Sequence, residues 1–401
     1  MKHISLLFLL IALLLSGCAV SRPAETAAGD PVQITLAQPE TTAPLPSVPD
    51  QPENKETAPS VPSFSDPIAE QVRQMSLEEL VGQLFVVACP DFGAVQEVQR
   101  CHLGGVILFS RDFEGQTPLT VRDRMDELQA ASPIPLLIAV DEEGGTVTRV
   151  SSEPAFRPEP FASPRALYEA GGTDLVLQTE KEKSQLLRSL GINVNLAPVA
   201  DICDDPAAFM YSRSPGLSSA DTADLVCQMV EVMRSQGIGS VIKHFPGYGN
   251  NTDTHTAMAD DWRTLEELEN RDLIPFRAAA ELGCDAIMVS HVIIHALDET
   301  MPASLSPAVH QYLRYDMGFD GVIMTDSLTM QAITDYYGPG EAAVLAVLAG
   351  SDMLCMQDYS MEYDALLEAA REGRVPLQRL QEAAVRILRW KAGLTHTGQF
   401  T

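Results

Sequence analysis

The sequence predicts a (β/α)8 barrel of the TIM type, an α/β fold, and two observations lead to this fold class. After residue 65, about eight short apolar runs alternate with amphipathic stretches. Each run is nearly continuous in Val, Ile, Leu and Met, as is typical of parallel strands covered on both faces. Many of the amphipathic stretches end at Gly, a common stop for helices. Eight strand–helix alternations in this length favour one barrel that forms a single catalytic domain.

The individual elements follow from these runs and stretches. The expected strands are Leu84–Ala88, Gly105–Phe109, Leu136–Val140, Val194–Val199, Ser240–His244, Ala286–Ser290, Gly321–Thr325 and Asp352–Met356. The main expected helices are Val121–Ala131, Val176–Leu190, Ala220–Gln236, Leu265–Leu282, Glu341–Leu348 and Leu377–Ala392.

The amino-terminal end has the layout of a signal peptide, which we assign to residues 1–17. Met1-Lys2-His3 precedes an apolar run that is too short to span a bilayer as a stable helix. The ending Leu15-Ser16-Gly17-Cys18 resembles the bacterial lipobox, which implies cleavage before Cys18 and lipidation of that cysteine. The alternative is an ordinary secretory signal that happens to end in Cys. We therefore expect an extracytoplasmic lipoprotein that is anchored to a membrane through Cys18.

Residues 18–64 are rich in Pro, Thr, Ser, Ala and Glu and have no sustained hydrophobic periodicity. Such a segment cannot bury enough apolar surface to offset the entropy lost on ordering. We expect a disordered tether between the anchor and a barrel over residues 65–396.

The charge of the chain bears on nucleic acid as a partner, and its cysteines bear on zinc binding. The chain has 55 acidic and 27 basic residues, a net charge of −28, which argues against nucleic acid as a partner. Six cysteines remain besides Cys18, and they show no short-spaced zinc pattern. Several lie inside apolar runs, where buried free thiols are expected.

Ionisable residues follow successive expected strands. Because active sites of such barrels lie where the strands end, these side chains should converge on one pocket, although each alone could be a helix cap or a buried hydrogen-bonding residue. They are Asp141, Asp201, Lys243-His244, Ser290-His291 and Asp326.

The most informative segment is Lys243–His255. An apolar run ends in Lys243-His244, a Gly, Pro and Asn loop follows, and Asp253-Thr254-His255 closes it. A cation, an imidazole and a carboxylate that can polarise a second imidazole are the parts of an acid/base site. The alternative is a sharp turn in which Asp253 and Thr254 only cap the next element.

These segments resemble glycoside hydrolase family 3, in its β-N-acetylhexosaminidase branch. The resemblance runs from Met75–Leu84 to the last helix. The segments that carry it are Gly104–Phe109, the Asp-x-Glu-Gly-Gly segment at Asp141–Arg149, the Lys-His-Phe-Pro-Gly-x-Gly signature at Lys243–Gly249 with Asp253–His255, and the nucleophile strand at Gly321–Leu328. The β-glucosidases of this family have Lys-His-Phe followed by Ala.

The resemblance implies a retaining mechanism with Asp326 as the nucleophile. His255 would be the acid/base, with Asp253 as its orienting carboxylate. Residues expected to contact the sugar are Asp141, Arg149, Arg213, Lys243 and His244. No cofactor is implied. A metal is not expected either, since the pair His291 and His295 lacks the Glu of the metalloprotease pattern.

The implied function is a retaining exo-β-N-acetylglucosaminidase that hydrolyses terminal GlcNAc from cell-wall-derived or other amino-sugar glycans. The sequence departs from the family pattern at three places. Tyr248 stands where members of the family often have His, and Thr146 stands where many have Arg. The stretch Asn250–Thr252 is one residue shorter than the usual insertion. The alternatives are a β-N-acetylglucosaminide phosphorylase, a β-glucosidase or β-xylosidase, and a glycan-binding lipoprotein without turnover.

Overall fold

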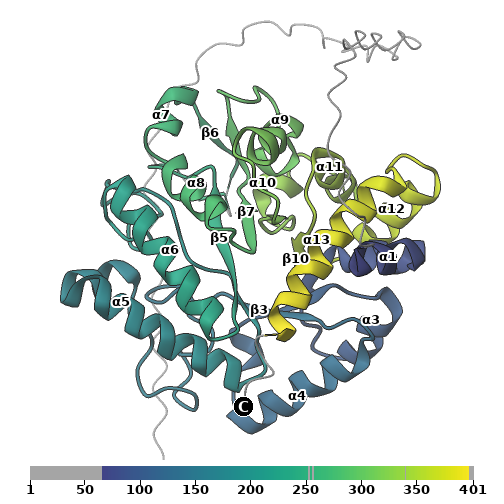
Figure 1. Ribbon diagram of the computed structural model, residues 1–401, viewed down its shortest axis with the longest axis horizontal. Helices are drawn as coiled ribbons and strands as arrows, with labels where there is room; N and C mark the ends of the chain where they lie inside the picture. The colour runs from purple at the N-terminus through teal and green to yellow at the C-terminus, as the bar shows by residue number, and fades with distance from the viewer. Residues whose placement is uncertain (1–65, 252, 255–256, 339, 397–401) are drawn as a thin grey trace, which may run out of the picture. The chain divides into compact units, whose positions relative to one another are not determined.

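Eight parallel strands with helices between them form the centre of the structure (Figure 1). The computed structural model describes residues 66–251, 253–254, 257–338 and 340–396. In spatial order the strands are β10 (Leu354–Met356), β1 (Phe85–Ala88), β2 (Gly105–Leu108), β3 (Leu137–Val140), β4 (Val194–Asn195), β5 (Gly239–Phe245), β7 (Ala286–Val289) and β9 (Val322–Thr325).

The two outer strands of this order also meet. β1 pairs in parallel with β10, with Phe85 opposite Leu354. On the other side, a parallel bridge joins Met324 to Met353, just before β10. The amide of Thr325 donates to the carbonyl of Met353 at 3.0 Å. The sheet is therefore a nearly closed barrel, which confirms the predicted fold class.

The helices lie between successive strands, as the alternating sequence pattern predicts. Capping residues set several of their starts. Ser76 and Glu79 form a capping box at α2, and Ser218 accepts the amide of Asp221 at α6. The helices are α1 (Pro67–Gln74), α2 (Leu77–Gln83), α3 (Ala94–Cys101), α4 (Pro118–Ala131), α5 (Pro164–Ser189), α6 (Ser219–Ser235), α7 (Leu265–Glu269), α8 (Leu273–Glu281), α9 (Pro307–Gln311), α10 (Gln331–Thr334), α11 (Glu341–Ala349), α12 (Ser360–Arg371) and α13 (Leu377–His396).

Several elements differ from their predicted bounds, and three of these differences are informative. The helix expected at Leu265–Leu282 is two helices, α7 and α8, separated by residues 270–272. The fourth strand ends at Asn195 rather than Val199, and the amide of Ala197 donates back to Asn195 O at 2.8 Å instead of to a neighbouring strand. The chain rejoins β5 through a bridge between Val199 and Lys243. Helix α5 begins at Pro164, well before the predicted Val176, and a kink at Gly171 and Gly172 divides it.

A second, small sheet follows the barrel strands at one side. It consists of β6 (Ala259–Asp261) and β8 (Val292–Ile294), which pair in parallel. Since β8 begins three residues after β7 ends, this sheet lies beyond the carboxyl end of β7. The sequence pattern did not reveal this pair.

The six cysteines of the barrel segment are free thiols, and five of them are buried, as predicted. No helix in the described part of the chain is long and apolar enough to cross a membrane. The signal peptide, Cys18 and the expected tether lie outside the described residues.

Candidate active site

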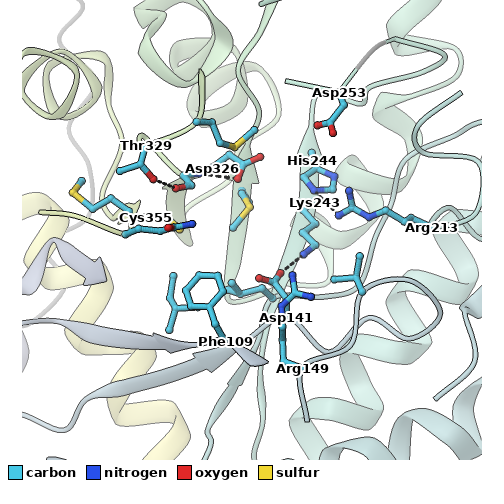
Figure 2. A pocket seen from close by; sticks show the side chains of 18 of the residues that line it. Phe109, Asp141, Arg149, Arg213, Lys243, His244, Asp253, Asp326, Thr329 and Cys355 are labelled. Carbon is cyan, nitrogen blue, oxygen red and sulfur yellow. Dashed lines mark hydrogen bonds and ion pairs between the residues drawn. The ribbon is translucent and has the colours of Figure 1, made fainter. Parts of the chain in front are cut away.

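A cavity of about 760 Å³ opens where the barrel strands end (Figure 2). Lys243 and His244 lie at the carboxyl end of β5, just before its last residue Phe245, and Asp326 follows β9 directly. Seven of the eight residues expected to act on substrate line this cavity: Asp141, Arg149, Arg213, Lys243, His244, Asp253 and Asp326. The eighth, His255, lies outside the described residues.

The cavity floor is an ionic cluster. Lys243 Nζ lies 2.7 Å from Asp141 Oδ1 and 2.8 Å from Glu143 Oε1. Arg213 clamps Glu143 with two hydrogen bonds, from Nε at 2.9 Å and from Nη2 at 2.6 Å. Glu143 is fully enclosed, whereas the side chain of Asp141 is 20% exposed. Asp141 can therefore reach a ligand, and Glu143 serves to hold the two cations.

These contacts fix the charges of the cluster. Burial opposes ionisation of Glu143, but the charges of Lys243 and Arg213 outweigh it and hold the pKa of this carboxyl well below its usual range. Burial likewise opposes protonation of Lys243, and the carboxylates of Asp141 and Glu143 raise its pKa in spite of that. The floor thus offers a permanent cation and a partly exposed carboxylate side by side.

The loop after β3 is shaped by two glycines and one buried carboxylate. Gly144 has a φ of 102°, and a Cβ there would lie 2.3 Å from the carbonyl oxygen of Ala162. Glu142 points away from the ionic cluster and accepts the amides of Arg149 and Val150 at 2.8 and 2.7 Å. The carboxylate therefore folds the loop back and places Arg149 on the cavity wall.

His244 is held in one tautomer. Its Nδ1 lies 2.8 Å from Asp201 Oδ2, and its Nε2 lies 3.2 Å from Arg213 Nη2. Because a guanidinium can only donate, Nε2 accepts and Nδ1 carries the proton that is donated to Asp201. Asp201 also accepts the amides of His244 and Tyr248, at 3.0 and 2.7 Å. One buried carboxylate thus orients both the ring and the start of the following loop.

A hydrogen bond between two residues of the loop after β5 holds this loop in place. Tyr248 is buried, and its hydroxyl forms a hydrogen bond with the hydroxyl of Thr254. Burial and then the charge of Asp326 raise the pKa of Tyr248 well above its ordinary value. Tyr248, which stands where a His is more frequent, therefore holds Thr254 in place, next to Asp253. The shortened loop still brings Asp253 to the cavity.

Asp326 is positioned by backbone contacts. Its amide donates to Val289 O at 2.9 Å, and the amide of Ser327 donates to Asp326 Oδ1 at 2.7 Å. The carbonyl of Ser327 lies 2.9 Å from Nε2 of the buried His291, whose Nδ1 lies 2.7 Å from Ser304 Oγ. Since a carbonyl only accepts, the Nε2 of His291 carries its proton. His291 thus holds the segment that carries Asp326.

The cavity has polar side chains on both sides (Figure 2). Arg213, His244 and Asp253 lie on one side, and Asp326, Thr329, Phe109 and Cys355 lie on the other. Further apolar side chains that line the cavity are Ile107, Val147, Leu196, Phe209, Met288, Met330 and Met356. A ligand that offers both hydroxyls and C–H surface matches this mixed lining.

Sequence reasoning named Asp201 and His291 among the strand-end residues and included Glu143 only within the segment Asp141–Arg149, without giving any of the three a role in the site. A usable signal exists for Glu143. Alternate residues after a strand point the same way, so Asp141 and Glu143 should face the cation of β5 together. Among the described residues, no group of three or more His, Cys, Asp or Glu side chains is placed to bind a metal ion.

The chain is similar to known proteins over most of its barrel. The model of the glycosyl hydrolase family 3 N-terminal domain matches residues 76–390. The chain is 31% identical over 331 residues to the β-hexosaminidase LpqI of Mycobacterium tuberculosis, which covers 79% of this chain and 83% of that protein. It is 32% identical over 277 residues to a β-hexosaminidase of Nitrosomonas eutropha, covering 67% and 78% of the two chains.

A solved structure is also similar. It is a glycoside hydrolase family 3 β-N-acetylglucosaminidase from Paenibacillus sp. FPU-7, which superposes with a TM-score of 0.75 at 34% identity. The match covers 82% of this chain and 64% of that one. From the family match over residues 76–390 and these relatives, we conclude that the chain belongs to glycosyl hydrolase family 3.

Proposed function

We propose that this protein is a retaining exo-β-N-acetylglucosaminidase that hydrolyses terminal GlcNAc from cell-wall-derived or other amino-sugar glycans. The observation that carries the proposal is the position of two carboxylates. Asp326, after β9, and Asp253, in the loop after β5, line one cavity together with the cluster around Lys243. The β-hexosaminidase names of the similar proteins support the sugar assigned.

The first step forms a glycosyl-enzyme. A carboxylate oxygen of Asp326 attacks the anomeric carbon, and the bond from that carbon to the leaving oxygen breaks. The leaving oxygen takes a proton from His255. The role assigned to Asp253 is to orient this imidazole and to stabilise its protonated form.

The second step releases the sugar. His255, now neutral, removes a proton from water, and the resulting nucleophile displaces Asp326 from the anomeric carbon. Two displacements at one carbon retain its configuration. A histidine suits both roles because its ordinary pKa lies near neutrality.

Binding depends on the ionic cluster. Asp141 accepts hydrogen bonds from sugar hydroxyls while Lys243 and Arg149 donate to others. Apolar residues of the cavity lining, such as Phe109 and Met356, meet the C–H surface of the ring. A preformed cluster of paired charges needs little reorganisation when the sugar binds, which favours catalysis.

Turnover of a chromogenic β-GlcNAc glycoside, compared with the matching β-glucoside, tests this function. We expect hydrolysis of the first in clear preference to the second, and loss of activity in Asp326→Ala. Asp335→Ala, an exposed carboxylate on the same segment, is the matched control and should keep activity. Turnover of neither glycoside would point to glycan binding alone, and a sugar phosphate formed on adding phosphate would point to phosphorolysis.

We also propose that Cys18 is lipidated and that residues 18–64 tether the barrel to a membrane. The supporting observation is the sequence around Cys18, with its apolar run and Ser-Gly-Cys ending. In a bacterial host, the full chain should enter the membrane fraction, and Cys18→Ser should leave it. A Cys18→Ser protein that stays in the membrane fraction would contradict the lipid anchor.

A further inference from the structure

We propose that Trp262 and the groove beside it form a second saccharide-binding site, which takes the part of the glycan beyond the sugar that is cleaved. This inference rests on the proposed function. It concerns a surface outside the catalytic cavity, since none of the residues that line the groove lines the cavity.

Trp262 has the properties of a stacking platform. It follows β6, and its side chain is 74% exposed although it is large and apolar. One face of the indole stacks on the ring of His295, with centroids 3.5 Å apart and planes at 9°. His295 Nε2 lies 2.7 Å from Asp260 Oδ1, and the amide of His295 donates to Asp261 O at 3.0 Å. The ring is therefore held in place before any ligand arrives, with its second face toward solvent.

The groove beside Trp262 has a volume of about 460 Å³ and polar walls. Its cations are already paired: Arg263 lies 2.5 Å from Asp261, and Arg271 lies 3.3 Å from Asp204. An anionic ligand would have to compete with these carboxylates, so the groove favours an uncharged one. The walls also include Asn250 and Asn251, whose amides can donate to and accept from hydroxyls.

A saccharide is the uncharged ligand that uses both features. The face of an aromatic ring is electron-rich, so it attracts the partly positive C–H groups on the flat side of a pyranose. The hydroxyls at the edge of that pyranose then meet the amides and charged groups of the groove. A protein partner would instead require an apolar patch, and Trp262 is the single large apolar side chain that lines this groove in the described part of the chain.

The position of the groove links it to the reaction. The loop after β5 contributes Asp253 to the cavity, while Asn250 and Asn251 of the same loop line the groove. In the proposed mechanism this loop protonates the leaving oxygen, so the leaving part of the glycan faces the loop. Because Asn250 and Asn251 come only three and two residues before Asp253 in the chain, a glycan that leaves the cavity across this loop would run toward the groove.

Kinetics on two substrate lengths test this site. The quantity to compare is the kcat/KM for N-acetylchitotetraose divided by the kcat/KM for 4-nitrophenyl β-GlcNAc. We expect Trp262→Ala to lower this ratio by about threefold to tenfold, which is the range for the loss of one aromatic contact. Trp262→Phe keeps a ring and should recover most of the ratio. Tyr315→Ala removes another exposed aromatic, one that does not line the groove, and should leave the ratio unchanged. A ratio unchanged in Trp262→Ala would overturn the proposal.

Fluorescence gives a readout that does not need turnover. The chain has two tryptophans, and Trp390 is only 6% exposed, so acrylamide quenching reports mainly on Trp262. In full-length Asp326→Ala protein, N-acetylchitotetraose should protect this emission, and maltotetraose should not. If neither sugar protects, the second site is wrong even where the wild-type enzyme hydrolyses the chromogenic glycoside. If protection occurs without any hydrolysis by the wild type, the proposed function is wrong and the groove remains a saccharide site.

Discussion

At the scale of single residues, the site separates groups that can touch a ligand from groups that hold them. Asp141 is partly exposed, and Glu143 is enclosed between Lys243 and Arg213. Asp201 fixes the tautomer of His244 in the same way. Lys243 and His244 are therefore both held by buried carboxylates that do not line the cavity, and removing those carboxylates should alter catalysis without a change in the contacts to substrate.

His291 offers the clearest test of such a positioning residue. Its Nε2–H donates to the carbonyl of Ser327, whose amide donates to Asp326. His291→Ala should let this segment shift, and small misplacements of reacting groups cost about a hundredfold in rate. We expect kcat to fall by about tenfold to a hundredfold while KM changes little. His291→Gln, which can supply an N–H to the carbonyl, should recover part of kcat. A lower melting temperature with unchanged kcat would show that His291 only stabilises the fold.

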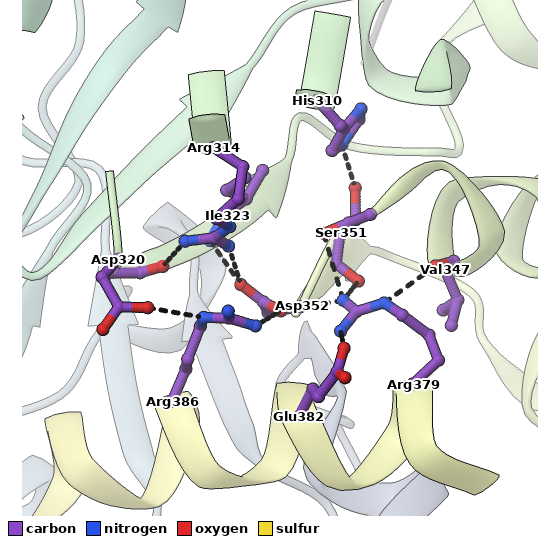
Figure 3. Close-up of polar contacts among 12 residues, drawn as sticks. His310, Arg314, Asp320, Ile323, Val347, Ser351, Asp352, Arg379, Glu382 and Arg386 are labelled. Carbon is purple, nitrogen blue, oxygen red and sulfur yellow. Dashed lines mark hydrogen bonds and ion pairs between the residues drawn. The ribbon is translucent and has the colours of Figure 1, made fainter. Parts of the chain in front are cut away.

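At the scale of elements, a buried carboxylate joins β9 to β10 (Figure 3). Asp352 precedes β10, and its Oδ2 accepts the amide of Ile323 at 3.0 Å. Arg314 and Arg379 approach its two oxygens at 2.7 and 2.8 Å, and Arg386 lies at 3.3 Å. Burial alone would raise the pKa of Asp352, but the three arginines hold it below its ordinary value. The cluster therefore secures the place where the barrel closes.

Replacing this carboxylate should weaken the closure strongly. Asp352→Asn leaves three partly buried arginines without the buried counter-charge between them, and breaking such an ion cluster costs about 3–5 kcal/mol. Chemical denaturation should show that loss in the free energy of unfolding. Asp320→Asn is the matched control, since Asp320 is 78% exposed and lies 3.4 Å from Arg386. It should change stability by less than about 0.5 kcal/mol. Equal effects of the two substitutions would contradict a structural role for the cluster.

The sequence predicted the strands well because each is an apolar run buried on both faces. It placed β5 and β9 nearly to the residue, and so placed Lys243, His244 and Asp326 correctly. It missed the break between α7 and α8, where the apolar spacing continues across residues 270–272 while buried Asp272 binds Arg263 at 2.6 Å. That pairing depends on tertiary contacts that a local pattern does not contain. The short sheet of β6 and β8 was missed for the same reason.

At the scale of the whole molecule, the last helix packs against the first ones. Helix α13 lies beside α1 and contacts α2 (Figure 1). Lys391 of α13 is buried, and its Nζ donates to Gln83 Oε1 of α2 at 2.7 Å. Gln83 in turn donates to His102 O at 2.8 Å. Burial lowers the pKa of Lys391 from 10.5 to about 7, so its charge is disfavoured in the folded state.

This depressed pKa predicts how stability depends on pH. Between about pH 7 and 10.5 the unfolded chain binds more protons at Lys391 than the folded one, so stability rises with pH in that window. Relative to Lys391→Met, the wild-type free energy of unfolding should rise by about 1.4 kcal/mol per pH unit at most there, and level off below pH 7. Lys181→Met, an exposed lysine, should show no such difference. A flat difference for Lys391→Met would mean that this lysine has an ordinary pKa.

The central claim of the account is that Asp326 becomes covalently bound to the sugar. A 2-fluoro or 5-fluoro glycoside slows release of the sugar, so the intermediate should accumulate and the protein should gain the mass of one glycosyl group. Peptide mass spectrometry should then place the label on Asp326. A label on any other carboxylate, or inactivation without a covalent adduct, would contradict the assignment.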